Sequence, residues 1–202
     1  MKTSKQFRYI IEVYRNAQTV KNNNKFTTVN ELCDQVPALR PEVLKEATDW
    51  LLSQGKFAGN KILTEEDKGA ILAGVVTLLA NKPLAVARWY PYKLPDAAAI
   101  KVSMTSEYRE GDLYLNGVTP GDRVTIIEDT ISSGGTIIAL VDAVRQAGAE
   151  VVEVLAVIEK VGYGGVVRVR EATGLTVKTG LGIKVDNAGR ISVVTDNSLQ
   201  EV

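Results

Sequence analysis

One segment, residues 124–136, constrains the fold more than any other part of the chain. It reads Val-Thr-Ile-Ile-Glu-Asp-Thr-Ile-Ser-Ser-Gly-Gly-Thr, so four β-favouring residues lead directly into the acids Glu128 and Asp129. A helix is expected from Ile137 to Ala147, because Gly148 follows as a helix-ending residue. A buried parallel strand that ends in carboxylates places them at the carboxyl edge of its sheet, where α/β proteins bind ligands. The segment therefore predicts a strand, a ligand-binding turn and a helix.

The turn in this segment has the composition of a phosphate site. It offers backbone N–H groups, a helix N-terminus and the hydroxyls of Ser132, Ser133 and Thr136. Gly134 and Gly135 allow the backbone to approach an anion closely. The adjacent acids would repel that anion, so they are better placed to accept hydrogen bonds from the hydroxyls of a sugar. A phosphate pocket beside a diol pocket predicts a site for a ribose 5-phosphate group.

The segment resembles the signature with which type I phosphoribosyltransferases bind phosphoribosyl diphosphate (PRPP). It differs from a Walker loop, which ends in Gly-Lys-Ser/Thr, and from the GxGxxG dinucleotide fingerprint. The resemblance implies that Glu128 and Asp129 bind the ribose hydroxyls and act as catalytic carboxylates near C1. It also implies a 5-phosphate cradle that consists of Thr130, Ile131, Ser132, Ser133, Gly134, Gly135 and Thr136.

Composition agrees with a cytoplasmic enzyme of one α/β domain and an appendage. The chain has 202 residues with 24 basic and 24 acidic side chains, and this zero net charge argues against a general binder of nucleic acid or membrane surfaces. The single cysteine, Cys33, cannot form an internal disulfide, which fits a reducing compartment. No apolar run reaches the length of a membrane span.

The chain contains no histidine. A Ser-His-Asp triad, a histidine-ligated zinc ion and an imidazole acid or base are therefore excluded. Phosphoribosyl transfer fits the remaining side chains, because its diphosphate leaving group carries Mg²⁺ while the protein orients the reactants and stabilises charge. We expect Mg²⁺ as the cofactor, held mainly by PRPP and not by a protein site alone.

Predicted strands and helices alternate along the rest of the chain. Helices are expected over residues 5–18, 41–54 and 70–79, and strands over 61–63, 84–89 and 151–158. Residues 92–114 show no clear periodicity. Continuous apolar strands that alternate with helices indicate a parallel twisted sheet flanked by helices. Resemblance to type I phosphoribosyltransferases adds a small hood built from the N-terminal and C-terminal segments.

A charged loop between a predicted strand and an apolar helix resembles the diphosphate loop of these enzymes. It consists of Glu66, Asp67, Lys68 and Gly69. The resemblance implies that Lys68 meets the leaving group, and the helix N-terminus behind Gly69 adds positive potential.

Two further features resemble purine phosphoribosyltransferases. Arg88 precedes Leu94-Pro95 with a spacing like that of archaeal hypoxanthine-type enzymes, but Trp89 stands where a lysine is expected, which puts part of the diphosphate contact in question. Glu107 and Tyr108 match a Glu-Tyr pair on the flexible lid of adenine enzymes. By this resemblance, Arg88 contacts PRPP and Glu107 is a catalytic group that handles a proton of the purine ring.

Residues 1–59 allow two interpretations. They form the hood over a phosphoribosyltransferase domain of residues 60–202, or they form a winged helix-turn-helix like that of purine-operon regulators that sense PRPP. Nine Lys and Arg against six Asp and Glu leave a weak electrostatic footprint, which favours the hood and argues against a nucleic-acid partner.

The sequence is thus identified as a member of the purine branch of the type I phosphoribosyltransferases, close to archaeal hypoxanthine-type proteins. The resemblance implies transfer of phosphoribosyl from PRPP to adenine or hypoxanthine by a cytoplasmic homodimer. The alternatives are a PRPP-sensing regulator and an orotate- or xanthine-type transferase.

Overall fold

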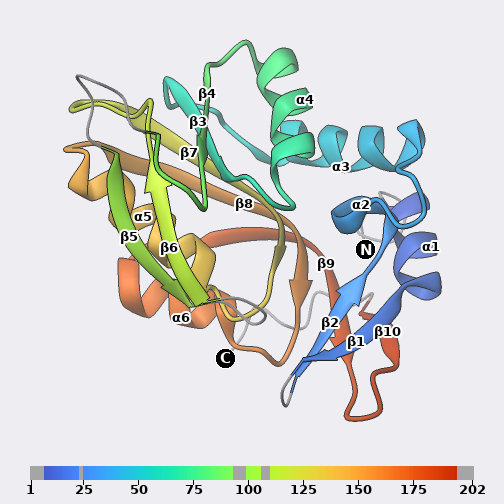
Figure 1. Cartoon of the computed structure of the whole chain (residues 1–202). Coiled ribbons are helices and arrows are strands. Elements are labelled where there is room, and N and C mark those ends of the chain that lie inside the picture. Colours follow the sequence, from blue (N-terminus) through green and yellow to red (C-terminus); the bar gives the residue numbers. More distant parts are fainter. Residues whose placement is uncertain (1–6, 23–24, 93–98, 106–109, 195–202) are drawn as a thin grey trace.

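A six-stranded, mostly parallel sheet forms the centre of the molecule (Figure 1). The computed structural model describes residues 7–22, 25–92, 99–105 and 110–194. Spatial order across the sheet is β10-β9-β8-β7-β3-β4, and only β10 runs antiparallel to its neighbour. The strands are β3 (Lys61–Glu65), β4 (Leu84–Ala87), β7 (Arg123–Ile131), β8 (Glu150–Lys160), β9 (Val177–Val185) and β10 (Ile191–Val194).

Helices cover both faces of the sheet, as the alternation of apolar segments predicted. The helices α5 (Gly135–Gln146) and α6 (Gly165–Thr173) lie on one face, and α3 (Pro41–Gln54) and α4 (Ala70–Ala80) lie on the other. Successive side chains of β7 point alternately into the two hydrophobic cores, one on each face of the sheet. Ile126 packs toward α5, and Ile127 packs toward α3 and α4. Each is fully buried and contributes about 1.5–3 kcal/mol to folding. The predicted fold class is confirmed.

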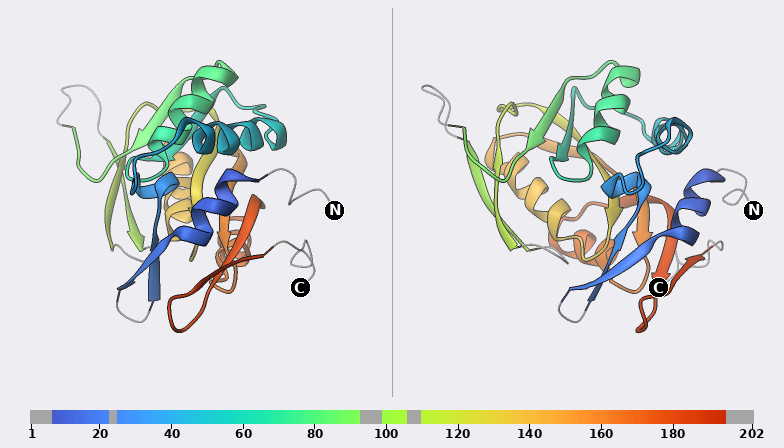
Figure 2. Two further views of the ribbon diagram at one scale, coloured as in Figure 1. Left: turned by 90° about the vertical axis from the view of Figure 1, so that its right-hand side faces the viewer. Right: turned by 45° about the vertical axis from the view of Figure 1, so that its right-hand side comes forward.

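Segments from the two ends of the described chain lie side by side at one edge of the sheet, as the predicted hood requires (Figures 1 and 2). The N-terminal part of this arrangement, residues 9–34, is called the hood below. After α1 (Tyr9–Asn16), the strands β1 (Gln18–Asn22) and β2 (Lys25–Val29) form an antiparallel hairpin that leads to the short helix α2 (Glu31–Asp34). The Thr19 hydroxyl donates a 2.9 Å hydrogen bond to the carbonyl of Gly189 in the β9–β10 turn. The helix predicted over residues 5–18 is therefore too long, because residues 18–22 pair with β2 instead.

Helix α3 belongs to the main core, although the sequence placed it in the N-terminal segment. Its residues Val43, Ala47, Trp50 and Leu51 are buried in the same apolar cluster as Ile127 of the central strand. Within the described residues, α3 is thus part of the cover of the sheet. The division of the chain at residue 60 stays a prediction. Among these residues, no helix has the length and apolar character needed to cross a membrane.

The stretch 92–114, which showed no clear periodicity, contains a β-hairpin. Strands β5 (Ile100–Thr105) and β6 (Glu110–Leu115) pair antiparallel and pack against α5. Val102 and Met104 are buried while the alternate residues Lys101, Ser103 and Thr105 are exposed, which is the alternation of a half-buried strand. The mixed side-chain types hid this alternation from the sequence analysis. Residues 93–98 and 106–109 lie outside the described part of the chain.

Candidate active site

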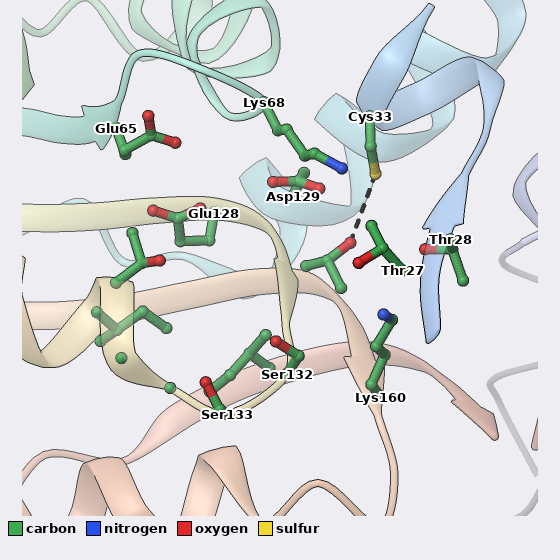
Figure 3. Close-up of a pocket in the computed structure, with 16 residues that line it drawn as sticks. Thr27, Thr28, Cys33, Glu65, Lys68, Glu128, Asp129, Ser132, Ser133 and Lys160 are labelled. Atoms are coloured by element: carbon green, nitrogen blue, oxygen red, sulfur yellow. Dashed lines mark hydrogen bonds between the residues drawn. The ribbon is translucent and has the colours of Figure 1, made fainter. Parts of the chain in front are cut away.

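A pocket opens at the carboxyl ends of β3, β7 and β8 (Figure 3). This is the edge at which a parallel sheet presents the ends of its strands and α/β proteins bind ligands. The pocket is lined by Thr27, Thr28, Cys33, Glu65, Lys68, Glu128, Asp129, Thr130, Ile131, Ser132, Ser133, Gly134, Gly135, Thr136, Ile137 and Lys160. The structure therefore brings together the whole of the predicted 128–136 segment, one residue of the predicted loop and six residues that the sequence did not single out as site residues.

The turn between β7 and α5 is packed too tightly to accept a side chain at Gly134. Gly134 has a φ of +76°, and a Cβ there would lie 2.8 Å from the carbonyl oxygen of Gly165 at the start of α6. A Cβ on Gly165 would lie 2.1 Å from the carbonyl oxygen of Ser132. Arg168 of α6 donates a 3.2 Å hydrogen bond to the carbonyl of Ser133. Helix α6 thus packs against the turn and fixes its conformation. The first-turn N–H groups of α5 remain suited to binding an anion.

The acids Glu128 and Asp129 lie near the end of β7, as the sequence predicted, and the strand continues for two more residues to Ile131. Both are almost fully buried, at 4% and 3% exposure. Oε1 of Glu128 and Oδ2 of Asp129 have no hydrogen-bond partner among the described residues. Burial raises the pKa of Glu128, and the neighbouring Asp129 and Glu65 raise it further. Burial also raises the pKa of Asp129, against the opposing effects of Cys33, Lys68 and Thr130. Carboxylate oxygens that are buried without partners are a costly arrangement, and a ligand with hydroxyl donors or a cation would relieve it.

Glu65 is a third acid at this edge, at the end of β3. Its Oε1 accepts hydrogen bonds from the backbone N–H of Asp67 at 2.8 Å and from Nε1 of Trp89 at 2.7 Å. Burial raises the pKa of Glu65 to about 7, although these two hydrogen bonds lower it. Trp89, which stands where a lysine is expected, thus fixes the carboxyl group of Glu65 in the pocket by a hydrogen bond.

Replacing Glu65 with Gln is expected to make stability less dependent on pH. In the wild type the carboxyl keeps its proton in the folded state up to about pH 7 but loses it near 4.5 when unfolded. Its favourable contribution is therefore complete below about pH 4.5 and is lost as the pH rises through 7, a change of about 3 kcal/mol. Gln retains an acceptor for Asp67 and Trp89. Denaturant unfolding of both proteins at about pH 5 and pH 8 checks this. A difference in unfolding free energy between the wild type and the variant that is the same at both pH values would contradict it.

Lys68 is the one residue of the predicted diphosphate loop that lines the pocket. Its ammonium forms a 2.8 Å ion pair with Oδ1 of Asp34 on α2, and its side chain is only 17% exposed. Burial acts to lower the pKa of Lys68, but Asp34 and the charges of Cys33 and Asp129 outweigh it and raise the pKa. Asp67 directs its N–H toward Glu65, and a Cβ on Gly69 would lie 2.2 Å from Oγ1 of Thr64.

Arg88 lies outside the pocket lining in this structure. Its guanidinium forms a 2.8 Å ion pair with Glu66 and lies over the ring of Tyr92 at 5.7 Å. Its backbone pairs with Tyr114 of β6. The predicted residues Arg88 and Glu66 are therefore brought to each other, and not to the acids of β7. Glu107 lies outside the described residues.

Residues of the hood and of β8 complete the pocket. Lys160 ends β8, is 3% exposed and donates a 3.0 Å hydrogen bond to the carbonyl of Phe26 in the hood. Cys33 of α2 contacts Oγ1 of Thr130 at 3.5 Å (Figure 3). Charged residues at the carboxyl end of a buried strand were the signal that marked Glu128, and the same signal could have found Glu65 and Lys160. The hood residues carried no such signal, because a threonine or cysteine in a short segment is usually structural.

Comparison with known proteins agrees with this geometry. No protein-family model matches the chain. The hypoxanthine/guanine phosphoribosyltransferase of Methanocaldococcus jannaschii is 37% identical over 169 residues, which are 83% of this chain and 90% of that protein. The enzyme of the same name from Methanothermobacter thermautotrophicus is 38% identical over 182 residues, 90% of this chain and 92% of its own.

Among solved structures, adenine phosphoribosyltransferase from Rhodothermus marinus superposes with a TM-score of 0.66 at 28% identity. The match covers 85% of this chain and 96% of that one. Together with the acid pair and the glycine turn at one sheet edge, these likenesses show that the chain belongs to the type I phosphoribosyltransferases, in their purine branch.

Proposed function

We propose that the protein transfers the 5-phosphoribosyl group of PRPP to a free purine base, which yields a nucleoside 5′-monophosphate and diphosphate. One observation carries the proposal: the buried acids Glu128 and Asp129, each with an unpartnered oxygen, lie directly beside the glycine turn at the N-terminus of α5. The acids suit a diol and the turn suits a phosphate. Ribose 5-phosphate contains both groups.

In the proposed reaction, Thr130 to Thr136 bind the 5-phosphate through backbone N–H groups and hydroxyls. Glu128 and Asp129 accept hydrogen bonds from the ribose hydroxyls and stabilise the positive charge that develops on the ribose as the diphosphate leaves. Because both acids are buried, their interaction with that charge is stronger than it would be in water.

The residues at this edge also fit Mg²⁺. Hard cations prefer oxygen ligands, and unpartnered carboxylate oxygens are available on both β7 acids. Among the described residues, no group of three or more His, Cys, Asp or Glu is arranged to hold a metal. We therefore propose that Glu128 and Asp129 share the ion with oxygens of PRPP. When bound, Mg²⁺ neutralises charge on the departing diphosphate.

For the diphosphate itself we propose Lys68, the backbone of Asp67 to Gly69 and Arg88. Lys68 is already at the pocket. Arg88 would have to exchange its ion pair with Glu66 for a phosphate oxygen. A guanidinium suits such an exchange, because carboxylate and phosphate present similar acceptor geometry.

Hypoxanthine and guanine are the bases we propose, in preference to adenine. The relatives at 37–38% identity are named for these two bases. Lys160 supports the choice, because its ammonium only donates hydrogen bonds and so favours a 6-oxo group over a 6-amino group. We expect kcat/KM for hypoxanthine to exceed that for adenine by at least about tenfold, the equivalent of one good hydrogen bond. Equal values, or a preference for adenine, would overturn the choice of base.

Replacing Glu107 with Gln is expected to slow nucleotide formation about a hundredfold while PRPP binding stays nearly intact. The motivation is the Glu-Tyr pair that resembles the lid of adenine enzymes, and a general acid or base typically contributes at least this factor. Single-turnover kinetics together with PRPP titration calorimetry checks both parts. A variant as active as the wild type would remove Glu107 from the reaction and leave the PRPP site unaffected.

We further propose that the enzyme is a cytoplasmic homodimer. Helix α4 exposes Ile71, Leu78 and Leu79, at 46%, 78% and 58%, and such an apolar face commonly marks a protein interface. Light scattering of the purified protein tests the assembly, since a monomer would have the chain mass of 21.9 kDa.

A further inference from the structure

The short helix α2 joins the hood to both sides of the pocket. Its first turn is fixed by Asn30, whose side chain accepts hydrogen bonds from the N–H groups of Leu32 at 2.9 Å and Cys33 at 3.1 Å. Asn30 in turn donates its backbone N–H to Oδ2 of Asp34 at 2.9 Å. The helix ends at Gln35, in the left-handed region with a φ of +54°. The position of the Asp34 carboxylate is therefore fixed by a hydrogen bond within its own turn, independently of its contact with Lys68.

Two successive residues of this turn contact residues of two different elements that line the pocket. Cys33 contacts Thr130 of β7. The second oxygen of Asp34 forms the 2.8 Å ion pair with Lys68, in the loop between β3 and α4. Figure 3 shows the Lys68 ammonium near Cys33 and Asp129, and the charge of Asp129 also acts on it. The lysine thus extends from its loop toward the acids of β7, with a hood carboxylate at its tip.

We propose that Asp34 is a positioning residue, which holds the ammonium of Lys68 where the diphosphate of PRPP binds. The inference rests on the proposed function, since it assumes a diphosphate group next to the ribose acids. A lysine side chain loses conformational entropy when it is fixed in one position. Asp34 fixes it before the substrate arrives, so less of the binding free energy is spent on ordering. The hood, through α2, thereby takes part in binding PRPP as well as covering the base.

A double-mutant cycle on Asp34→Asn and Lys68→Gln tests this proposal. Asn keeps the acceptor for the Asn30 N–H but removes the charge that holds Lys68. We expect Asp34→Asn to raise both the KM for PRPP and the Kd for inorganic diphosphate by about tenfold, while the KM for the base stays unchanged. In the Lys68→Gln background the same change should have little further effect, because its target is gone.

Arg40→Gln is the matched control. It breaks another ion pair of the same turn, the 2.9 Å contact between Arg40 and Glu31, and Arg40 does not line the pocket. We expect it to lower the unfolding midpoint and leave the KM for PRPP unchanged. If it raised that KM as much as Asp34→Asn, the effect would be a general loosening of the hood, and Asp34 would have no specific role.

Two other results would overturn the inference. Additive effects of Asp34→Asn and Lys68→Gln would show that Asp34 does not act through Lys68. Tighter diphosphate binding in Asp34→Asn would show that Asp34 competes with the ligand. Should Asp34→Asn fail to fold, Asp34→Glu keeps the charge but displaces the ammonium, and its Kd for diphosphate should rise in the same direction. Diphosphate binding is measured without turnover, so a wild type that is inactive with every base would refute the proposed function and still leave Asp34 tested.

Discussion

Replacing Asp129 with Asn is expected to lower nucleotide formation at saturating PRPP by two to three orders of magnitude. Asn keeps the shape of the side chain but removes an anionic acceptor at a position that is 3% exposed. The loss of a charged contact that acts mainly in the transition state costs about 3 kcal/mol or more, which corresponds to this factor. Steady-state kinetics with saturating PRPP measures it directly. Near-normal turnover would remove Asp129 from the reaction.

The same substitution is not expected to unfold the protein. Burial raises the pKa of Asp129, which means that the charged form is held at a cost that neutral Asn does not carry. The unfolding free energy of Asp129→Asn should therefore equal or exceed that of the wild type near neutral pH. Asp49→Asn is the matched control, because the Asp49 side chain is 57% exposed on α3 and does not line the pocket. It should change neither turnover nor stability by a measurable amount.

Replacing Gly165 with Ala is expected to lower kcat/KM for PRPP about a hundredfold, although Gly165 does not line the pocket. Its new Cβ would lie 2.1 Å from the carbonyl oxygen of Ser132 and 3.0 Å from the backbone nitrogen of Gly134. Neither backbone atom can move without displacing the phosphate turn. A displacement of about 1 Å at a substrate-binding element can reduce the rate about a hundredfold, and the overpacking also costs about 1–3 kcal/mol of stability.

Gly74→Ala provides the control for the glycine experiment. Gly74 lies in the middle of α4, and a Cβ there would have no heavy atom within 4 Å. Alanine in a helix interior is favoured over glycine by about 1 kcal/mol, so this variant should be slightly more stable and bind PRPP normally. If Gly165→Ala also bound PRPP normally, the contact between α6 and the turn would not define the phosphate site.

The parts of the site that are contiguous in sequence could be predicted, because a strand, two acids and a glycine turn carry their own geometry. Glu128 to Thr136 all line the pocket as the sequence implied. Gly165 could not be assigned in the same way. It acquires its place only when α6 packs against the turn, and this depends on contacts between segments far apart along the chain.

The hood residues that line the pocket and the β5–β6 hairpin were harder to predict from the sequence, for a different reason. Cys33 and Thr27 reach the pocket from a short helix and a strand that hold few residues each, so no periodic pattern marks the face they present. In β5, the inward positions are Val102 and Met104, with a lysine and a serine at the alternate ones, and so short an alternation resembles a loop. The contact of Trp89 could not be predicted, because Glu65, which accepts the hydrogen bond of its indole N–H, lies 24 residues earlier in the chain.

The most direct test of the account is diphosphate release from PRPP by the wild-type protein, measured in the presence of Mg²⁺ with adenine, hypoxanthine, guanine, xanthine and orotate in turn. If the protein is a purine phosphoribosyltransferase, we expect one diphosphate to be released for each nucleotide formed. Hypoxanthine or guanine should be the best substrate, and orotate should give no release. Release with orotate alone would identify a pyrimidine-type enzyme on the same PRPP site. Tight PRPP binding without release in any of the five reactions, together with a DNA fragment that is shifted only when PRPP is absent, would contradict the enzymatic account and indicate a PRPP-sensing regulator.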